Sequence, residues 1–344
     1  MMKALSSTVT VFLFICLLVI QYTLPIPSHY ALMAAFIFFV FNVIIIIKST
    51  DYMVGSIAQY TDKLRIPAFL VGFVIISATT TFPDISAGFF ASLAGHGDLI
   101  LGDVVMAVMV DIGLLTALAA LILRKIPTNK HEMGGIFAWG IVLLMLIPFI
   151  FGFDGKFSRF EGIVLILIFG CYTLALVLRE VRLSHIVKKI PLKDIWKEII
   201  IFDVALAIIL LASRYLVVSA TYIAQRFHLS PFIIGLFFVA LGTSLPEILF
   251  QIKAARSGVI DIGFGNSLGS LLVDTFLVTG IAAVVRPFEF PRFTFLFSYL
   301  FMMVVVISVI LLFKRRFITW KHGIFILSLF ILFLIVNLIL GLTS

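Results

Sequence analysis

The sequence predicts an all-α integral membrane protein of about eleven transmembrane helices: ten form two inverted five-helix repeats, and one extra helix precedes them. Three observations predict this fold. The chain has 344 residues, of which 62% are hydrophobic and only 12% charged, about half the charged fraction of a soluble domain. Apolar runs of roughly 20 residues, long enough to cross a bilayer, recur along the whole chain. The two halves also match each other at a constant spacing.

The apolar runs place the helices in chain order. Residues 1–29 contain an extra helix at 8–25, whose composition also fits a cleaved signal peptide. No small-residue cleavage site follows it, so we interpret it as a retained span. Each repeat then has five predicted helices, and the basic segment 179–197 connects repeat 1 (30–178) to repeat 2 (198–344). The predicted helices are 30–60, 66–94, 99–122, 134–152 and 158–178, then 198–225, 230–254, 260–284, 292–313 and 318–341.

The repeats are recognised from an offset of 163 residues. The offset is clearest in two segments, about 66–120 and 230–284, which carry a proline and an acid within apolar sequence. It pairs identical or similar residues over a long stretch, including Gly72/Gly235, Thr80/Thr243, Pro83/Pro246, Asp84/Glu247, Gly102/Gly265, Asp111/Asp274 and Thr116/Thr279. Because five spans separate equivalent points, the second copy is predicted to lie upside down relative to the first. Inverted repeats of this kind are typical of secondary transporters.

Basic residues predict the orientation. If the N-terminus is cytoplasmic, the inside segments hold eighteen lysines and arginines and the outside loops hold five. This asymmetry follows the positive-inside rule, so we expect a multi-pass protein, in the cell membrane, with its N-terminus in the cytoplasm and its C-terminus outside. Topology therefore explains the net charge of +8 better than binding to nucleic acid does, and the lipid bilayer is the expected partner.

Other classes of function lack support in the sequence. Cys16 and Cys171 both lie in apolar runs and have neither disulfide nor metal-site spacing. The six histidines show no ligand spacing. We find no nucleophile paired with a base and no phosphate-binding loop, and we expect neither enzymatic activity nor a cofactor. The sequence leaves the oligomeric state open.

The candidate site is the pair of matching motifs Thr79-Thr-Thr-Phe-Pro-Asp84 and Gly242-Thr-Ser-Leu-Pro-Glu247. A proline removes one N–H from a helix and leaves carbonyl oxygens free, and a bound cation can satisfy them within lipid. Acids at membrane depth are costly and usually mark an ion pathway. A single motif could equally be a proline kink beside an incidental acid, whereas two related by the repeat favour a site. The candidate hydroxyl ligands are Thr80, Thr81, Thr243 and Ser244.

The next helix of each repeat offers a second polar face. Asp103, Ala107 and Asp111 are spaced four residues apart and so lie on one side of a helix. Asn266, Ser270 and Asp274 repeat this spacing. We predict that Asp111, Asp274 and Ser270 line the site. Asp103 and Asn266 lie nearer the helix start, where they could instead bond the backbone or complement the helix dipole. An oxygen-only set of this kind suits hard cations such as Ca²⁺, or Na⁺ where the charge is lower.

Gly242-Thr-Ser-Leu-Pro-Glu247, with Gly265-Asn266 and Gly269-Ser270-x-x-x-Asp274, resembles the second alpha-repeat of the sodium/calcium exchanger family in the calcium:cation antiporter superfamily. Residues 77–116 resemble a divergent first alpha-repeat. The resemblance implies a ten-helix core, Ca²⁺ bound at Asp84 and Glu247 near the carbonyls of Thr80 and Thr243, and Asp111 and Asp274 completing the site. It also implies Na⁺ sites at hydroxyls such as Ser244 and Ser270, and movement of helices 30–60 and 198–225 across a fixed core.

Repeat 1 departs from the family pattern at four places. Thr79 replaces the usual glycine, Asp84 the usual glutamate, Ala107 a serine and Asp111 a common asparagine. Ala107 removes an oxygen expected at a Na⁺ site. Four acids then surround the empty site, and desolvation and like-charge repulsion favour a proton on at least one of them. The sequence therefore predicts an antiporter that exchanges Ca²⁺ for Na⁺, H⁺ or both. Another divalent cation, a cation channel built on the same site, or an assembly partner that has lost transport are the alternatives.

Overall fold

The computed structural model describes residues 31–64, 71–127, 136–184, 196–227, 230–256, 260–315 and 317–343. The extra helix predicted at 8–25 and most of the predicted connector lie outside these residues. Each of the ten helical segments predicted after residue 30 is helical where the chain is described, and most of the predicted ends agree to within a few residues. The all-α membrane fold and the two repeats are confirmed.

The first repeat contains five helical segments, three of which change helix type along their length. Its elements are α2 (Ala31–Leu64), η1 (Val71–Ile76), α4 (Ser77–Thr80), α5 (Phe82–Ala94), α6 (Gly97–Val108), η2 (Met109–Leu114), α7 (Leu115–Leu123), β1 (Lys125–Pro127), α9 (Ile136–Phe151), η3 (Gly152–Asp154), β2 (Lys156–Phe157) and α10 (Arg159–Ser184). Segments η1 and η2 are π-helical, and η3 is a 3₁₀ turn.

The second repeat has the same plan. Its elements are α11 (Trp196–Phe227), α12 (Pro231–Ile234), η5 (Gly235–Val239), α13 (Ala240–Thr243), α14 (Leu245–Arg256), α15 (Ile260–Leu272), η6 (Val273–Val278), α16 (Thr279–Val285), β3 (Phe288–Glu289), α17 (Arg292–Phe313), β4 (Phe317–Thr319) and α18 (Trp320–Thr343). Segments η5 and η6 are π-helical at nearly the positions that the offset predicts from η1 and η2.

Length and apolar composition agree with a membrane location. Among the described residues, seven helices are long and apolar enough to cross a bilayer, and the bent pair Gly72–Thr80 and Phe82–Ala94 makes an eighth. The helix at Trp139–Asp154 is apolar but shorter. Many large apolar side chains on the outside are exposed, for example Leu143, Ile163 and Val304, as expected of a surface that faces lipid.

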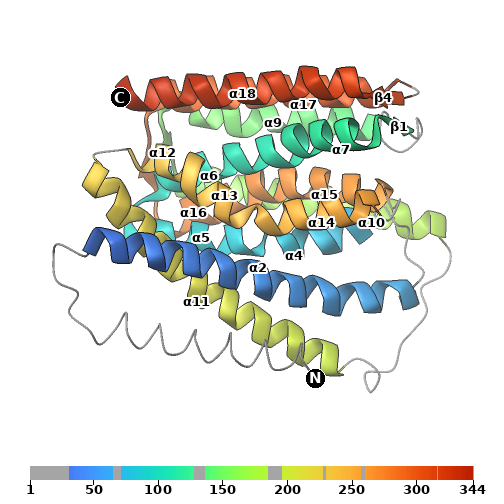
Figure 1. Ribbon diagram of the computed structural model, residues 1–344, viewed down its shortest axis with the longest axis horizontal. Coiled ribbons are helices and arrows are strands. Elements are labelled where there is room, and N and C mark those ends of the chain that lie inside the picture. The colour runs from blue at the N-terminus through green and yellow to red at the C-terminus, as the bar shows by residue number, and fades with distance from the viewer. Residues whose placement is uncertain are drawn as a thin grey trace.

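Equivalent helices of the two repeats run in opposite directions. In Figure 1 the chain passes from α6 to α7 from left to right, but from α15 to α16 from right to left. Likewise α4 leads leftward into α5, while α12 leads rightward through α13 into α14. The inversion predicted from the odd number of spans is therefore visible in the structure.

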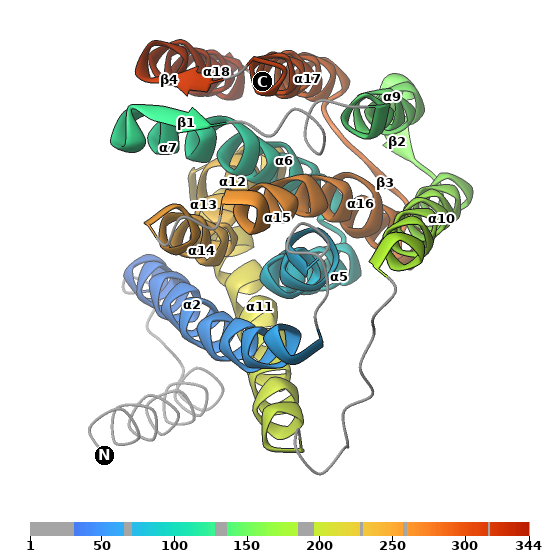
Figure 2. The same cartoon turned by 90° about the vertical axis from the view of Figure 1, so that its right-hand side faces the viewer.

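The two repeats interlock rather than sit side by side. Helices α2 and α11 pack against each other on one side of the molecule, and the central segments α6 and α15 lie in the middle (Figure 2). At the periphery, α18 of repeat 2 packs on α7 of repeat 1, and α10 of repeat 1 packs on α16 of repeat 2. Two short antiparallel strand pairs, β1 with β4 and β2 with β3, also join one repeat to the other.

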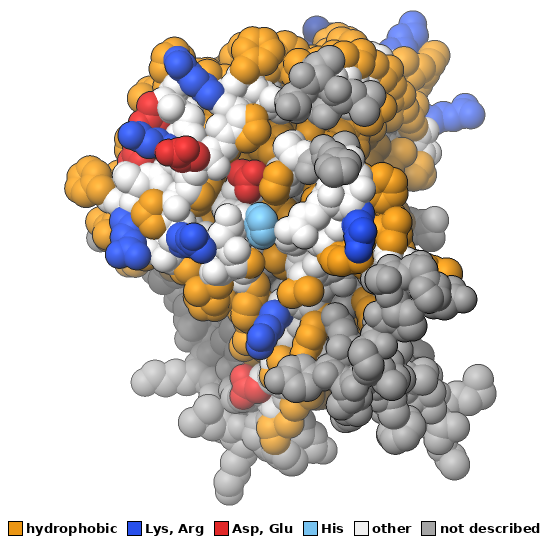
Figure 3. Space-filling model, turned by 90° about the vertical axis from the view of Figure 1, so that its left-hand side faces the viewer, with side chains coloured by type: hydrophobic (Ala, Val, Ile, Leu, Met, Phe, Trp, Pro, Cys, Tyr) orange, Lys and Arg blue, Asp and Glu red, His pale blue; other side chains and the backbone are white. Residues whose placement is uncertain are grey.

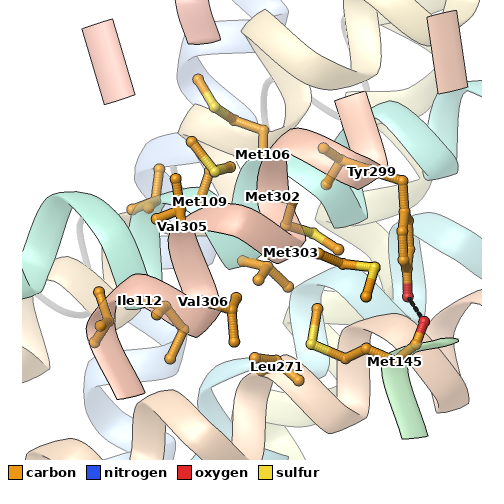
Figure 4. Close-up of a cluster of buried hydrophobic side chains, with 14 of the residues drawn as sticks. Met106, Met109, Ile112, Met145, Leu271, Tyr299, Met302, Met303, Val305 and Val306 are labelled. Atoms are coloured by element: carbon orange, nitrogen blue, oxygen red, sulfur yellow. Dashed lines mark hydrogen bonds between the residues drawn. The ribbon is translucent and has the colours of Figure 1, made fainter. Parts of the chain in front are cut away.

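A methionine-rich core fixes the middle of the first repeat. Met106 and Met109 pack with Met302 and Met303 of α17, beside valine and leucine side chains (Figure 4). The Tyr299 hydroxyl donates a hydrogen bond to the backbone oxygen of Met145 at 3.0 Å, which links α17 to α9. Methionine adapts to irregular gaps. The cluster therefore packs against η2, the π-helical segment that carries Asp111, and holds it in place.

Candidate cation site

Both proline–acid motifs lie where a helix is interrupted. The axes of Gly72–Thr80 and Phe82–Ala94 differ by 47°, and Thr81 at the break has φ −82° and ψ 0°. Ser244 occupies the matching break with φ −78° and ψ −6°. The proline falls in the first turn of the following helix, where its missing N–H costs nothing. The broken helices expected from the two prolines are thus present.

The breaks place both acids in the first turn of a helix. Asp84 belongs to the first turn of α5 and Glu247 to the first turn of α14. A helix N-terminus carries partial positive charge, so each carboxylate is partly compensated by its own helix. Both are 2% exposed. They are therefore buried acids held at helix ends, not surface groups.

Asp111 and Asp274 lie within π-helical segments of the next helices. Asp111 is in η2 and Asp274 in η6, and both are 1% exposed. A π-turn inserts an extra residue into the helix, shifts the side-chain register and frees backbone groups, and such turns are frequent at functional sites. Apolar sequence on both sides of each acid gave no warning of this helix type. Sequence reasoning therefore predicted the acids but not the helix geometry that presents them.

The buried charges are all negative. Five acids have buried side chains, namely Asp84, Asp103, Asp111, Glu247 and Asp274. No lysine, arginine or histidine is buried among the side chains that the structure describes. Each of the five acids has one oxygen without a hydrogen-bond partner in the described part of the chain. Unpaired carboxylate oxygens in a low-dielectric interior are costly, and a bound cation removes that cost.

Hydroxyl groups connect the two repeats around these acids. The Thr81 hydroxyl lies 3.0 Å from the Ser270 hydroxyl and 3.4 Å from a Glu247 oxygen. The electrostatic neighbours of Glu247 are Asp111, Asp84 and Asp274. The structure therefore brings the predicted acids into one region. Within the described residues, however, no three acidic, histidine or cysteine side chains lie close enough to hold one ion alone, so hydroxyl and carbonyl oxygens are needed to complete any site.

A second pair of contacts follows the repeat symmetry. The Thr243 hydroxyl lies 3.2 Å from a carboxylate oxygen of Asp103, and the Thr80 hydroxyl lies 3.2 Å from the side-chain oxygen of Asn266. Each threonine hydroxyl also lies near backbone oxygens of its own helix. Asp103 and Asn266 are fully buried and contact the opposite repeat. Each of these two side chains therefore bonds a threonine of the other repeat.

Glycine makes this contact possible. A Cβ added to Gly102 would lie 1.9 Å from the backbone oxygen of Phe232, and one added to Gly235 would lie 1.7 Å from that of Leu99. Helices α6 and η5 therefore cross with their backbones touching. The close crossing brings Asp103, the residue after Gly102, against Thr243.

A cavity of about 80 Å³ reaches the acid in η2. It lies among α7, α14, α15 and α17, and its polar lining comes from Asp111, Thr116, Gln251 and Ser267. Gln251 donates hydrogen bonds to the Gly263 backbone oxygen and the Ser267 hydroxyl, both at 2.5 Å. Ser267 in turn donates to the backbone oxygen of Asp111 at 3.1 Å. One flank of the candidate site is therefore hollow.

The matching flank in the other half of the molecule is packed. There the Ser92 hydroxyl donates to the backbone oxygen of Ala282 at 2.6 Å. A Cβ added to Gly88, the residue equivalent to Gln251, would lie 3.0 Å from the Val278 side chain. Helices α5 and α16 thus touch where α14 and α7 leave space.

A model of the family described as sodium/calcium exchanger protein matches residues 33–178 and 197–339. The chain belongs to the sodium/calcium exchanger family. It is accordingly a multi-pass membrane transporter and not an enzyme. The two matched regions coincide closely with the two structural repeats.

Several relatives of this exchanger-family chain are similar over most of their length. The inner membrane protein YrbG of Escherichia coli (strain K12) is 27% identical over 80% of this chain and 87% of its own. The sodium/calcium exchanger MaX1 of Methanosarcina acetivorans is 23% identical over 80% of this chain and 90% of its own. A structure of the sodium-calcium exchanger NCX_Mj soaked with 2.5 mM Na⁺ and 10 mM Sr²⁺ superposes with a TM-score of 0.66 at 22% identity, covering 88% of this chain and 98% of that one. The fold is the same.

Proposed function

We propose that this chain is a secondary antiporter that exchanges Ca²⁺ for Na⁺, H⁺ or both by alternating access. The observation that carries the proposal is the set of buried acids with no buried base among the described side chains. Four of these acids occupy two pairs of equivalent positions in inverted repeats, as expected for a transporter site at mid-membrane. The proposed ion-binding residues are Asp84, Glu247, Asp111, Asp274, Thr80, Thr81, Thr243, Ser244 and Ser270.

The chemistry of these groups favours Ca²⁺ as the transported divalent ion. Carboxylate, hydroxyl and carbonyl oxygens are hard ligands, which suit Ca²⁺ and Na⁺ and do not favour softer metals. Ca²⁺ accepts six to eight oxygens in a flexible arrangement. It therefore fits a site where carboxylates and neutral oxygens from broken helices both supply ligands. The ion is the cargo of the reaction, and no bond is made or broken.

Two features of the chain bear on the counter-ion. Repeat 2 retains hydroxyl groups at Thr243, Ser244 and Ser270 that suit Na⁺, and the names of MaX1 and NCX_Mj describe sodium exchange in those proteins. The unusual number of buried acids instead favours H⁺, because an empty site with this much negative charge is stabilised by protons. Both counter-ions therefore belong to the proposal.

The one-sided cavity supports a conformation open at one face. It extends from Asp111 toward Ile126, beside Arg124 and Lys125 at the end of α7. By the positive-inside rule this end is cytoplasmic, so we assign the structure to an inward-facing state in the cell membrane, with the C-terminus outside. The opposite end of the molecule, shown in Figure 3, carries lysine, arginine and acidic side chains interspersed with apolar ones.

Flux measurements test the function. The purified full-length chain is reconstituted in proteoliposomes, and ⁴⁵Ca²⁺ uptake is measured with Na⁺, K⁺ and pH gradients imposed one at a time. We expect saturable uptake that reverses when the Na⁺ or pH gradient is reversed. Uptake that is not coupled to either gradient, or that never saturates, contradicts an antiporter and indicates a channel. No Ca²⁺ movement with a pH gradient in the absence of Na⁺ rules out H⁺ as the counter-ion.

A further inference from the structure

Asp103 is a buried acid that is not among the proposed Ca²⁺ ligands. It lies near the middle of α6, is fully buried, and accepts a hydrogen bond from Thr243 with one oxygen only. Its other carboxylate oxygen has no partner among the described residues. No lysine or arginine is buried near it in that part of the chain. An unpaired carboxylate at membrane depth costs free energy, so we expect the charge of Asp103 to have a function.

The equivalent residue in repeat 2 shows that the fold does not need this charge. Asn266 occupies the matching position and makes the mirror-image contact with Thr80 at the same 3.2 Å. A neutral amide therefore provides the same hydrogen bond between repeats. Asp103 keeps the contact and adds a negative charge, and the charge must serve something other than packing.

The surroundings of Asp103 resemble a ligand set for a small cation of low charge. The Thr243 hydroxyl lies 3.2 Å from a carboxylate oxygen of Asp103, and Asp84 is an electrostatic neighbour of Asp103. The same hydroxyl lies 3.1 Å from the backbone oxygen of Val239, at the end of the π-helical segment η5. One unpaired carboxylate oxygen with neutral hydroxyl and carbonyl oxygens is hard-ligand chemistry with less charge than a Ca²⁺ site.

The neighbouring turn of α6 lacks a ligand that repeat 2 retains. Ala107 lies four residues after Asp103, on the same face of the helix, and has no side-chain oxygen where Ser270 has a hydroxyl. Asp103 therefore supplies a charged oxygen one helical turn before Ala107, which has no side-chain oxygen.

From these observations we infer that Asp103, with Thr243, forms a subsite for a monovalent hard cation, Na⁺, beside the proposed Ca²⁺ site. This inference rests on the proposed function for its place in the transport cycle, but Na⁺ binding to the subsite is measurable without transport. Because the charge is confined to repeat 1, the two halves of the molecule bind monovalent cations unequally.

The test removes the charge and keeps the shape. Asp103→Asn copies the residue found at position 266, and Asp98→Asn makes the same change in the first turn of the same helix, away from the buried acids. Equilibrium binding of ²²Na⁺ and of ⁴⁵Ca²⁺ is measured on the detergent-purified full-length protein. We expect Asp103→Asn to raise the Na⁺ concentration for half-saturation at least tenfold, and to change Ca²⁺ affinity in the absence of Na⁺ less than about threefold. Asp98→Asn should leave both unchanged.

Two results overturn the inference. Unchanged Na⁺ binding in Asp103→Asn leaves the residue with a packing role, and an equal loss of Ca²⁺ and Na⁺ binding makes Asp103 part of the Ca²⁺ site. Asp103→Ser removes the charge with a different shape and repeats the test should the asparagine variant not be monodisperse. A wild-type protein that binds ²²Na⁺ through Asp103 but exchanges no Ca²⁺ contradicts the proposed function and leaves the subsite standing.

Discussion

The two repeats differ at their helix breaks, where Thr81 of repeat 1 and Ser244 of repeat 2 occupy equivalent positions. In repeat 1, the Thr81 hydroxyl reaches both Glu247 and Ser270 of the other repeat. In repeat 2, the Ser244 hydroxyl is buried and has no partner among the described residues. The reason lies in the facing residues: the counterpart of Glu247 is the shorter Asp84, and the counterpart of Ser270 is Ala107. The presence of Asp84 and Ala107 in repeat 1 thus leaves the Ser244 hydroxyl of repeat 2 without a hydrogen-bond partner among the described residues.

This comparison shows how an inverted repeat can keep its fold while its chemistry diverges. The backbone features are shared, since each half has π-helical segments and a helix break at matching places. The side-chain oxygens are not shared. Repeat 2 supplies the longer acid Glu247 and the additional hydroxyl of Ser270, whereas repeat 1 supplies one additional acid, Asp103, where repeat 2 has Asn266. The result is a site with more negative charge on one side and more neutral oxygens on the other.

The largest expected effect comes from removing either acid at a helix break. Glu247→Gln and Asp84→Asn each keep shape and hydrogen bonding but lose the charge that pairs with the ion. We expect each to reduce ⁴⁵Ca²⁺ uptake in proteoliposomes by at least about 100-fold, because truncating one partner of a buried charge pair costs about 3–5 kcal/mol.

Both variants should remain folded and inserted, as judged by gel filtration in detergent. Substantial uptake by Asp84→Asn with loss in Glu247→Gln would show that only repeat 2 binds the divalent ion. That outcome would break the proposed pairing of the two repeats.

The glycine crossing provides the next test. Gly102→Ala places a methyl group against the Phe232 backbone, and overpacking of this kind costs about 1–3 kcal/mol. We expect a clear loss of thermal stability in detergent. Gly170→Ala is the matched control, because a Cβ there meets nothing within 4 Å. Equal stability of the two variants would mean that the backbones of α6 and η5 do not touch.

Restoring the missing hydroxyl sharpens the comparison further. Ala107→Ser gives repeat 1 the oxygen that Ser270 gives repeat 2, and it offers the Ser244 hydroxyl a partner. We expect Na⁺ to compete with Ca²⁺ at a concentration lowered up to about tenfold, equivalent to about 1.4 kcal/mol. Ser270→Ala should raise the Na⁺ concentration that is needed to compete with Ca²⁺. Competition of ⁴⁵Ca²⁺ binding by Na⁺ measures both, and a shift of the same sign in the two variants would contradict the comparison.

The smallest effect concerns packing outside the site. Tyr299→Phe removes the hydroxyl that bonds the Met145 backbone oxygen, and one such bond contributes about 1 kcal/mol. The residue at the equivalent position of repeat 1 is Ile136, which has no hydroxyl. We expect a small fall in melting temperature with unchanged Ca²⁺ uptake. A loss of uptake would show that the packing of α17 on η2 controls the position of Asp111.

Much of this architecture could be predicted from the sequence, because membrane helices are long apolar runs and a repeat is visible as an offset. The prolines at 83 and 246 also predicted where the helices break. The π-helical segments could not be predicted, since a π-turn within apolar residues has no distinctive composition. The strand pairs β1–β4 and β2–β3 were also missed, because two or three residues give no periodic pattern.

The candidate site was predicted less completely than the fold. The acids at 84, 111, 247 and 274 were singled out by the offset, and all are buried in one region of the structure. For Asp103, sequence position alone does not distinguish a residue that lines the site from one that acts near a helix start. Its contact with Thr243 depends on the close crossing of two helices from different repeats, and distance along the chain carries no information about such a crossing.

The strand pairs bear on how this chain is made. Strand β1 from the first half finds its partner β4 only near the end of the sequence, and α7 likewise waits for α18. During synthesis, the first half therefore enters the membrane before β4 and α18 are made. The surfaces of β1 and α7 that these elements cover are exposed until then. Because these contacts join the two halves, we expect that neither half folds alone and that expression of one half yields a product that membrane proteases remove.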